Sequence, residues 1–420
     1  MMNIIKKVVG NSFFQGSVFI TISNFAGGFL NYLFNIFVGR ALGPAGYGEI
    51  TTLFSYLTIL TIPIGVIIQL IIIKIGNKKD NILYTAALIN WLILKAKKYW
   101  IVAILVACLI PFVPQVTNLS PVIGYSLIPL VLLAYITGLY DGILQGLHVF
   151  FWASVIGIAS IFIKFLGSVV VLYLWQQIGI IIIFLLLSSL LKGVLSHIQL
   201  AKIIKQVSNK TPTLNKNIVA LITDPQILLT SISGAAILIL SNADIIFVKK
   251  VFTAEEAGIY GSWSLFAKVI LYVLGPLITV SFIFFSSKKN EKYHQLVLIG
   301  GIVLLLLSGF GAMLAYGLYG EFIIAMLFGK NFLQLLPFLE WASFFGISYT
   351  MIIFMNNYYL AKGNKAAYIL ACSLPIYIAG LIFYGTDLAH VMLVNIWFSF
   401  GVLGLYLLAF VKMRFITLFK

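Results

Sequence analysis

The sequence predicts an all-α integral membrane protein with about twelve transmembrane helices, arranged as two six-helix bundles related by pseudo-two-fold symmetry. Three observations predict this fold class. Of the 420 residues, 62% are hydrophobic and 9% are charged, whereas a soluble domain carries about 25% charged residues. The hydrophobic residues form long runs along the whole chain. A stretch near the start of the chain is also repeated, in weaker form, in the second half.

Each predicted span is an apolar run close to the ~20 residues that a helix needs to cross the hydrocarbon of a bilayer. The first run follows Lys6 and Lys7 and is too long for the apolar core of a signal peptide, so we expect it to be retained. The longest polar stretch, residues 199–223, separates six runs from six. It predicts an N-terminal bundle, residues 1–205, and a C-terminal bundle, residues 206–420. The expected spans are residues 13–38, 48–73, 99–115, 122–144, 151–174, 178–198, 224–248, 258–286, 296–318, 336–360, 366–384 and 390–411.

A shorter apolar run, Ile82–Leu94, is flanked by lysines on both sides. If it crossed the membrane, its two lysine clusters would lie on opposite faces. We therefore expect a helix that lies in the cytoplasmic interface, where short amphipathic segments with flanking lysines are stable. With this choice, and with the N-terminus inside, most Lys and Arg residues fall on the inner side. The outer gaps hold only Arg40, Lys249, Lys250 and Lys330.

This positive-inside bias predicts a multi-pass membrane protein with both termini in the cytoplasm. The net charge of +16 therefore reflects membrane topology, and we expect no nucleic-acid partner. The two cysteines, Cys108 and Cys372, lie in apolar runs and cannot build a disulfide framework. The sequence has neither the His, Cys and carboxylate spacing of a metal site nor a glycine-rich phosphate loop. We expect no metal, no cofactor and no catalytic residue.

An internal repeat relates the two halves. FVGRALGPAGYGEITTLFSYLTIL (Phe37–Leu60) resembles FVKKVFTAEEAGIYGSWSLFAKVIL (Phe247–Leu271), with Phe-Val, Ala-Gly and Leu-Phe pairs in the same order. A six-span unit repeated once gives both copies the same orientation, and two such halves that rock about a midplane site form a transporter architecture. The corner GRALGPAGYGEI (Gly39–Ile50) is then the tight outer turn between spans one and two, with Arg40 at the headgroup level.

The same corner, after a first apolar span, resembles the N-terminal hallmark of the polysaccharide flippases, the O-antigen translocases. YDGILQGL (Tyr140–Leu147) resembles the exit of span four in that family, and IIAMLFGKNFLQLLPFLEW (Ile323–Trp341) resembles its outer loop before span ten. The family shares a superfamily with the multidrug and toxic-compound extrusion transporters and the lipid II flippases. The resemblance covers most of the chain and lies in its layout rather than in one sharp motif.

This resemblance implies a substrate, an oligosaccharide linked through diphosphate to undecaprenol, which is moved from the inner to the outer leaflet of the bacterial cytoplasmic membrane. The expected partners are this lipid-linked oligosaccharide, membrane lipid, and a polysaccharide polymerase with a chain-length regulator. One alternative is a multidrug antiporter of the same superfamily, but a cavity for cationic drugs should be acidic, and span one carries no carboxylate. A membrane polymerase or glycosyltransferase would need larger outer loops, so we expect a transporter and not an enzyme.

Two lysines fall in the middle of predicted spans, Lys164 in SIFIKFLGSV and Lys268 in SLFAKVILY. A charge at bilayer depth costs at least about 2.5–3.5 kcal/mol, so it indicates a functional role. We expect both lysines to line a cationic cavity that accepts the substrate's phosphates. The alternatives are a structural ion pair with Asp244 or Asp141, or a lysine that reaches the membrane surface.

The remaining candidates are polar residues at the ends or on one face of the spans. Asp244 is expected to pair with Lys249 or Lys250 or to carry a coupling proton, and Asp141 to form an ion pair or take part in coupling. Asn24 and Asn31 share a face of span one, and Asn242 lies in the equivalent stretch of span seven. Their alternative role is polar contact between packed helices, worth about 0.6 kcal/mol each. The expected substrate-binding residues are Lys164, Lys268, Asn24, Asn31, Arg40 and Asn242.

Overall fold

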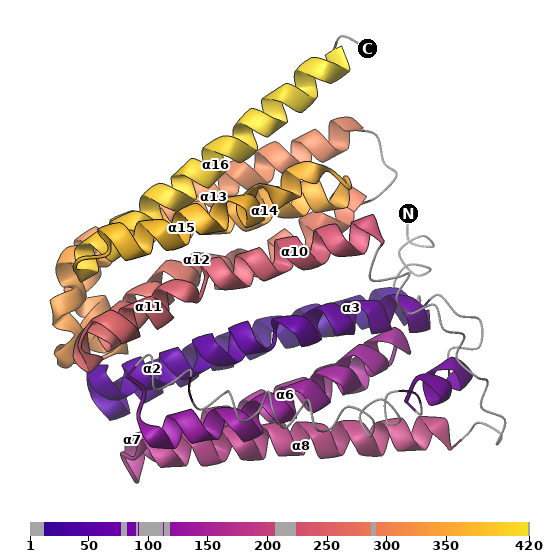
Figure 1. Cartoon of the computed structure of the whole chain (residues 1–420), viewed down its shortest axis with the longest axis horizontal. Helices are drawn as coiled ribbons and strands as arrows, with labels where there is room; N and C mark the ends of the chain where they lie inside the picture. Colours follow the sequence, from indigo (N-terminus) through magenta and orange to yellow (C-terminus); the bar gives the residue numbers. More distant parts are fainter. Residues whose placement is uncertain are drawn as a thin grey trace, which may run out of the picture. The chain divides into compact units, whose positions relative to one another are not determined.

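A computed structural model describes residues 12–76, 82–89, 91, 112, 118–205, 224–286 and 291–418 of the chain. All regular secondary structure in these residues is helical, as the sequence predicts (Figure 1). Long apolar helices follow from the composition, because in hydrocarbon a backbone must satisfy its own hydrogen bonds and a helix does so within one segment.

Nine helices in the described residues are long and apolar enough to cross a membrane, and the bent pair α2–α3 gives a tenth. The run expected at residues 99–115 lies outside the described residues except for residue 112, so the arrangement of twelve helices stays a prediction. The elements are α2 (Ser12–Leu60), α3 (Ile62–Gly76), α6 (Pro121–Gly146), α7 (Phe150–Tyr173), α8 (Ile178–Ile204), α10 (Pro225–Leu240), α11 (Ala243–Val251), α12 (Ala254–Ser286), α13 (Glu291–Leu327), η1 (Lys330–Phe338), α14 (Leu339–Ala361), η2 (Lys365–Tyr368), α15 (Ile369–Tyr384) and α16 (Leu388–Leu418).

The Gly- and Pro-rich corner is shorter than the turn that the sequence predicts. Helical backbone runs through α2 on both sides of a single non-helical residue, Gly43, which has φ 67° and ψ −176°. This conformation is open to glycine and strained for other residues, and Pro44 follows it without a donor N–H. A second bend of 48° separates α2 from α3. The predicted second span therefore consists of the end of α2 together with α3.

Backbone contacts group the chain into two compact units. The first unit comprises residues 1–41 and 56–227, and the second comprises residues 42–55 and 228–420. The boundary that the sequence predicts, between residues 205 and 206, lies at the edge of a segment outside the described residues and stays a prediction.

In the first unit, α6, α7 and α8 pack against one another, and α3 packs on α6. The hydroxyl groups of Ser160 on α7 and Ser188 on α8 lie 2.9 Å apart and join the two helices. Residues 82–89 form a short helix, and Leu88 packs in a cluster with Ile75 of α3 and Leu200 of α8. The flanking lysines lie outside the described residues, so the interfacial placement of this helix stays a prediction.

In the second unit, α14 is the central helix and packs against α12, α13 and α16. Most of its side chains are buried, including Phe345, Ile352 and Tyr359 at 0% exposure. The Trp263 ring of α12 stacks on the Phe345 ring with centroids 5.5 Å apart. This aromatic packing makes the second unit a dense bundle around α14.

The segment 42–55 of α2 belongs to this second unit. A methyl group added at Gly258 would meet the backbone carbonyl of Pro44, and one added at Gly48 would meet the backbone of Gly258. Tyr47 is fully buried and its ring lies 5.4 Å from that of Phe328. The two stretches that the sequence pairs as a repeat are therefore in direct backbone contact, which their glycines permit.

Candidate functional site

In the first unit, the α7 residue Lys164 reaches the polar face of α2. Its Nζ donates a 2.9 Å hydrogen bond to Oδ1 of Asn31 and lies 4.3 Å from the centroid of the Phe34 ring. Both of these partners are neutral. The lysine is half-buried and Phe34 is 1% exposed, so the ammonium lies in a largely apolar setting where its charge acts over a longer range than in water.

The asparagines of α2 are oriented by their own helix. Nδ2 of Asn31 donates to the carbonyl of Gly27 at 2.9 Å, which leaves Oδ1 to accept from Lys164. Nδ2 of Asn35 donates to the carbonyl of Asn31 at 2.7 Å. Asn24 lies two turns before Asn31 and is exposed. Arg40 is exposed too, three residues before the break at Gly43.

In the second unit, Lys268 of α12 points to a break in the neighbouring span. The helices α10 and α11 form one candidate span, Pro225–Val251, interrupted at Ser241 and Asn242, where Asn242 has φ −136° and ψ −20°. Nζ of Lys268 donates a 2.8 Å hydrogen bond to the carbonyl oxygen of Ser241. Nδ2 of Asn242 donates to the carbonyl of Leu238 at 2.8 Å. Both predicted residues therefore satisfy backbone carbonyls that the break leaves without helical partners.

Asp244, two residues after the break, is fully buried. Its Oδ2 accepts a 2.5 Å hydrogen bond from the hydroxyl of Tyr260, and that hydroxyl accepts one of 2.9 Å from Nδ2 of Asn395. Oδ1 of Asn395 in turn accepts from the hydroxyl of Tyr377 at 2.8 Å. A buried polar chain thus connects α11, α12, α16 and α15.

Among the described residues, Asp244 forms no ion pair with either of the lysines expected to pair with it. Nζ of Lys249 lies 2.6 Å from Oε1 of Glu49, so its ion pair is with the segment 42–55. Lys268 lies near enough to Asp244 for the two charges to act on each other, without a direct ion pair. Asp141 of α6 forms an ion pair with Lys192 of α8 at 2.5 Å, and both side chains are partly exposed.

The structure thus brings the predicted residues together in two places. Lys164 and Asn31 meet in the first unit, and Lys268, Asn242 and Asp244 gather around the helix break in the second. Four residues at these places are not among those that the sequence predicts: Phe34, Tyr260, Tyr377 and Asn395. Asn395 has a visible signal, since it is an amide within an apolar run, but an aromatic residue in such a run is not distinguishable from ordinary core.

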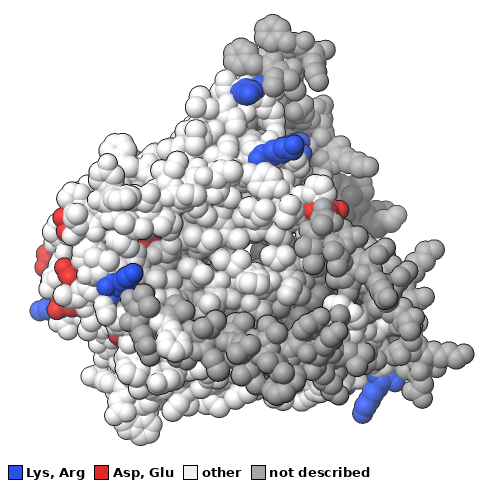
Figure 2. Space-filling model, viewed as in Figure 1, with Lys and Arg blue, Asp and Glu red and all other residues white. Residues whose placement is uncertain are grey.

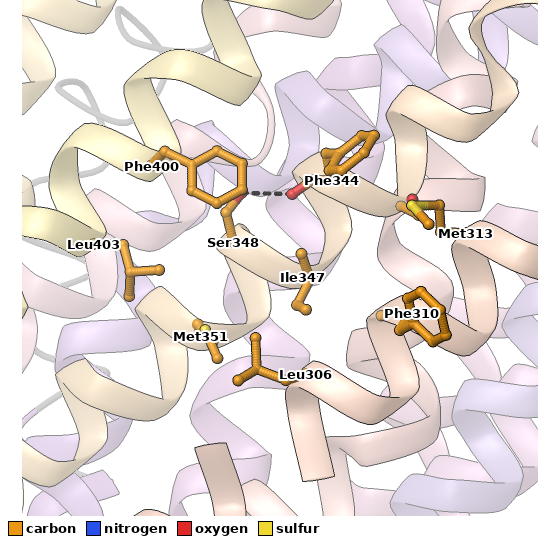
Figure 3. A pocket seen from close by; sticks show the side chains of 11 residues that line it. Leu306, Phe310, Met313, Phe344, Ile347, Ser348, Met351, Phe400 and Leu403 are labelled. Carbon is orange, nitrogen blue, oxygen red and sulfur yellow. Dashed lines mark hydrogen bonds between the residues drawn. The ribbon is translucent and has the colours of Figure 1, made fainter. Parts of the chain in front are cut away.

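A cavity of about 290 Å³ lies elsewhere in the second unit, between α13, α14 and α16 (Figure 3). The hydroxyls of its serines, Ser343 and Ser348, donate to carbonyls of α14 itself, so the walls present apolar groups. The predicted site residues do not line this cavity. Among the described residues, no group of three or more His, Cys, Asp or Glu is placed to hold a metal ion.

Several charged side chains of the second unit lie at helix ends. Figure 2 shows both acidic and basic side chains at the left end of the view, where Figure 1 draws the junctions of α11 with α12 and of α15 with α16. Glu255 and Glu256 begin α12, and Asp387 precedes α16. Lys362 follows the last residue of α14, and Lys365 begins η2. These two lysines lie at the ends that the sequence predicts to be cytoplasmic.

Comparison with known proteins identifies transporters of similar architecture. A family model described as "Polysaccharide biosynthesis protein" matches residues 13–289. The lipid II flippase MurJ, in an inward closed conformation, superposes with a TM-score of 0.69 at 17% identity, covering 95% of this chain and 87% of that one. An inward-facing multidrug resistance MATE family transporter of the MOP superfamily gives a TM-score of 0.66 at 13% identity, covering 93% and 94%. No curated protein sequence matches the chain.

At these identities the structural matches establish the fold alone. The chain shares the fold of these two transporters. The family model, which matches more than half of the chain, confirms the polysaccharide family resemblance seen in the sequence. Together with its apolar helices, the fold makes the chain a multi-pass membrane protein.

Proposed function

Because the chain belongs to the polysaccharide biosynthesis protein family, we propose that it is a flippase for undecaprenyl-diphosphate-linked oligosaccharide. It moves this lipid from the inner to the outer leaflet of the bacterial cytoplasmic membrane by alternating access, with both termini in the cytoplasm. The observation that carries the proposal is the position of Lys164, an ammonium in the middle of a candidate span and directed to the amide-bearing face of α2.

The chemistry of this position suits a phosphate. A lysine ammonium is a compact point charge with three donors, and Lys164 has a neutral amide oxygen and an aromatic face as neighbours. A diphosphate that approaches the ammonium is attracted more strongly there than in water because the surroundings are apolar. The exposed amide group of Asn24 supplies a donor and an acceptor of the kind that bind sugar hydroxyls, whereas the amide of Asn31 already contacts Gly27 and Lys164.

The other predicted residues are less well placed to bind the substrate. Lys268 and Asn242 are engaged by backbone carbonyls at the helix break, so each would give up a hydrogen bond to reach a phosphate. Arg40 is exposed just before the break in α2 at Gly43, which we assign to the outer headgroup level, where it would meet the diphosphate on release. A polymerase and a chain-length regulator would then receive the flipped lipid on that side.

Transport in proteoliposomes tests the proposal. Labelled lipid-linked oligosaccharide is incorporated into vesicles, and its appearance in the opposite leaflet is measured with the mass of the lipid checked before and after. Lys164→Ala is expected to slow translocation at least about tenfold, which corresponds to about 1.4 kcal/mol of lost interaction. Lys192→Ala, which removes an ammonium from α8 of the same unit, is the matched control and is expected to retain most activity.

The multidrug antiporter is the second candidate, since its fold is equally compatible with this chain. This function predicts that the protein exports organic cations. A positive charge near α2 would repel such cations and hinder their export. If Lys164→Ala leaves lipid translocation unchanged, or if the wild-type protein moves organic cations and not the lipid, the flippase proposal is wrong.

A further inference from the structure

The break in the span Pro225–Val251 concentrates negative charge inside the second unit. The C-terminal end of α10 carries the partial negative charge of a helix dipole. Two carbonyls at this end of the helix accept hydrogen bonds from side chains: that of Leu238 from the neutral amide of Asn242, and that of Ser241, the residue after α10, from the ammonium of Lys268.

Asp244 adds a carboxyl group to the same place. It is 0% exposed, and its Oδ1 is a buried oxygen with no hydrogen-bond partner among the described residues. Burial of a carboxylate without a counter-charge is very unfavourable. In transporters with broken helices, unwound carbonyls and helix C-termini commonly coordinate a cation at such a position.

Lys268 already brings a positive charge to this position. Its Nζ lies 2.8 Å from the Ser241 carbonyl oxygen, and it attracts the Asp244 carboxylate electrostatically. The lysine belongs to α12, which packs directly on α11. The amine is therefore covalently attached where an exchangeable cation would otherwise bind.

We infer that Lys268 is a resident counter-cation. Its ammonium neutralises the end of α10 and the carboxylate of Asp244, so this half of the protein requires no bound metal ion. Removal of the amine leaves a carboxylate and unwound carbonyls, which form an oxygen site for a monovalent cation such as Na⁺. This inference concerns a different property from the proposed function, because it holds whatever the substrate is.

The test measures thermal unfolding of the full chain in detergent, without substrate, in NaCl and in N-methyl-D-glucamine chloride of equal ionic strength. Wild type is expected to melt at the same temperature in both salts. Lys268→Met is expected to melt lower, and Na⁺ is expected to raise its melting temperature by about 2–4 °C or more with saturation. Lys192→Met, which also removes an ammonium from a carboxylate but at a partly hydrated site, is the matched control and is expected to show no Na⁺-specific rise.

A second substitution identifies the carboxylate. Adding Asp244→Asn to Lys268→Met removes the need for a cation, so the double variant is expected to recover stability and to lose the Na⁺ response. If Lys268→Met does not fold, Asp244→Asn alone is compared with the double variant, which is expected to be the more stable because the single variant retains a buried, uncompensated ammonium.

Three results would each overturn the inference: a saturable Na⁺-specific stabilisation of wild type, an equal melting temperature of folded Lys268→Met in the two salts, or a double variant less stable than Asp244→Asn alone. Since no substrate is present, none of them bears on whether the protein flips lipid-linked oligosaccharide.

Discussion

The ammonium of Lys249 lies 2.6 Å from Oε1 of Glu49, and the two side chains are only 3% and 14% exposed. Glu49 belongs to the part of α2 that follows Gly43, whereas Lys249 lies in α11. The pair therefore fixes the segment 42–55 within the second unit, although the residues before and after that segment belong to the first.

Breaking this pair from one side is expected to destabilise the protein. Glu49→Gln leaves a buried ammonium without its carboxylate, a change that costs about 3–5 kcal/mol at buried sites. Removing both charges with Glu49→Gln and Lys249→Met is expected to restore most of that loss. Melting temperatures of the two single variants and the double variant measure the coupling, and additive effects would contradict a direct pair.

The contact between Gly258 and Pro44 allows no side chain. A Cβ at residue 258 would overlap the Pro44 carbonyl, so Gly258→Ala is expected to cost about 1–3 kcal/mol through backbone displacement. Gly311→Ala on α13 is the matched control, because no atom lies within 4 Å of its added Cβ, and alanine favours the helix. Thermal unfolding compares them, and equal stability of the two variants would disprove the close contact.

Asn31→Asp changes the charge of the proposed phosphate site while the shape of the side chain stays nearly the same. A carboxylate in place of the amide would neutralise Lys164 at the 2.9 Å distance seen here, so lipid translocation is expected to fall at least about tenfold. The melting temperature is expected to stay close to that of wild type, because a new ion pair offsets the burial of the carboxylate. Wild-type transport by a folded Asn31→Asp variant would exclude a need for net positive charge at Lys164.

Two tyrosines of the polar chain are expected to differ in their contribution to stability. Tyr260→Phe removes the hydroxyl that donates to Asp244, and loss of a hydrogen bond to a carboxylate costs about 1.5–3 kcal/mol. Tyr377→Phe removes a hydroxyl that donates to the neutral amide of Asn395, which costs about 0.5–1.5 kcal/mol. Melting temperatures should follow this order, and the reverse order would argue against a charged Asp244.

Asp387 caps the start of α16 and predicts a pH effect. Its Oδ1 accepts from the backbone N–H of His390 at 2.9 Å, and the His390 ring lies 2.7 Å from Oδ2. These hydrogen bonds, the backbone one first, hold the pKa of Asp387 below its ordinary value. A depressed folded-state pKa gives stability that is present above the unfolded value of about 3.9 and is lost as the pH falls through the folded value.

Asp387→Asn should therefore flatten the decline of melting temperature as the pH falls below the ordinary Asp pKa of about 3.9. The effect is expected to be small because both side chains are more than half exposed and water screens such pairs. A melting curve series across this range on wild type and variant measures it. An unchanged decline in the variant would show that the cap contributes nothing.

Much of the fold is predictable from this sequence because lipid imposes a single solution. Long apolar runs become helices, and a Gly-Pro pair between two of them becomes a break at Gly43. The family resemblance likewise rests on the layout of corners and spans along the chain, and the family model confirms it. Lys164 can be recognised in the sequence because a charged residue within an apolar run usually has a functional role.

The interaction partners of the buried charged residues could not be predicted from the sequence, because the pattern of apolar residues does not show which helix faces pack together. The sequence predicts Lys249 or Lys250 as the partner of Asp244, whereas in the structure Lys249 pairs with Glu49 and the charge of Lys268 acts on the carboxylate. Nothing local marks Tyr260 and Asn395 as members of one chain of hydrogen bonds, since they are 135 residues apart. The sequence by itself thus determined the helices and the family. Only the tertiary structure decided how the buried charges are compensated, because Coulomb energy depends on distances between residues that packing alone brings together.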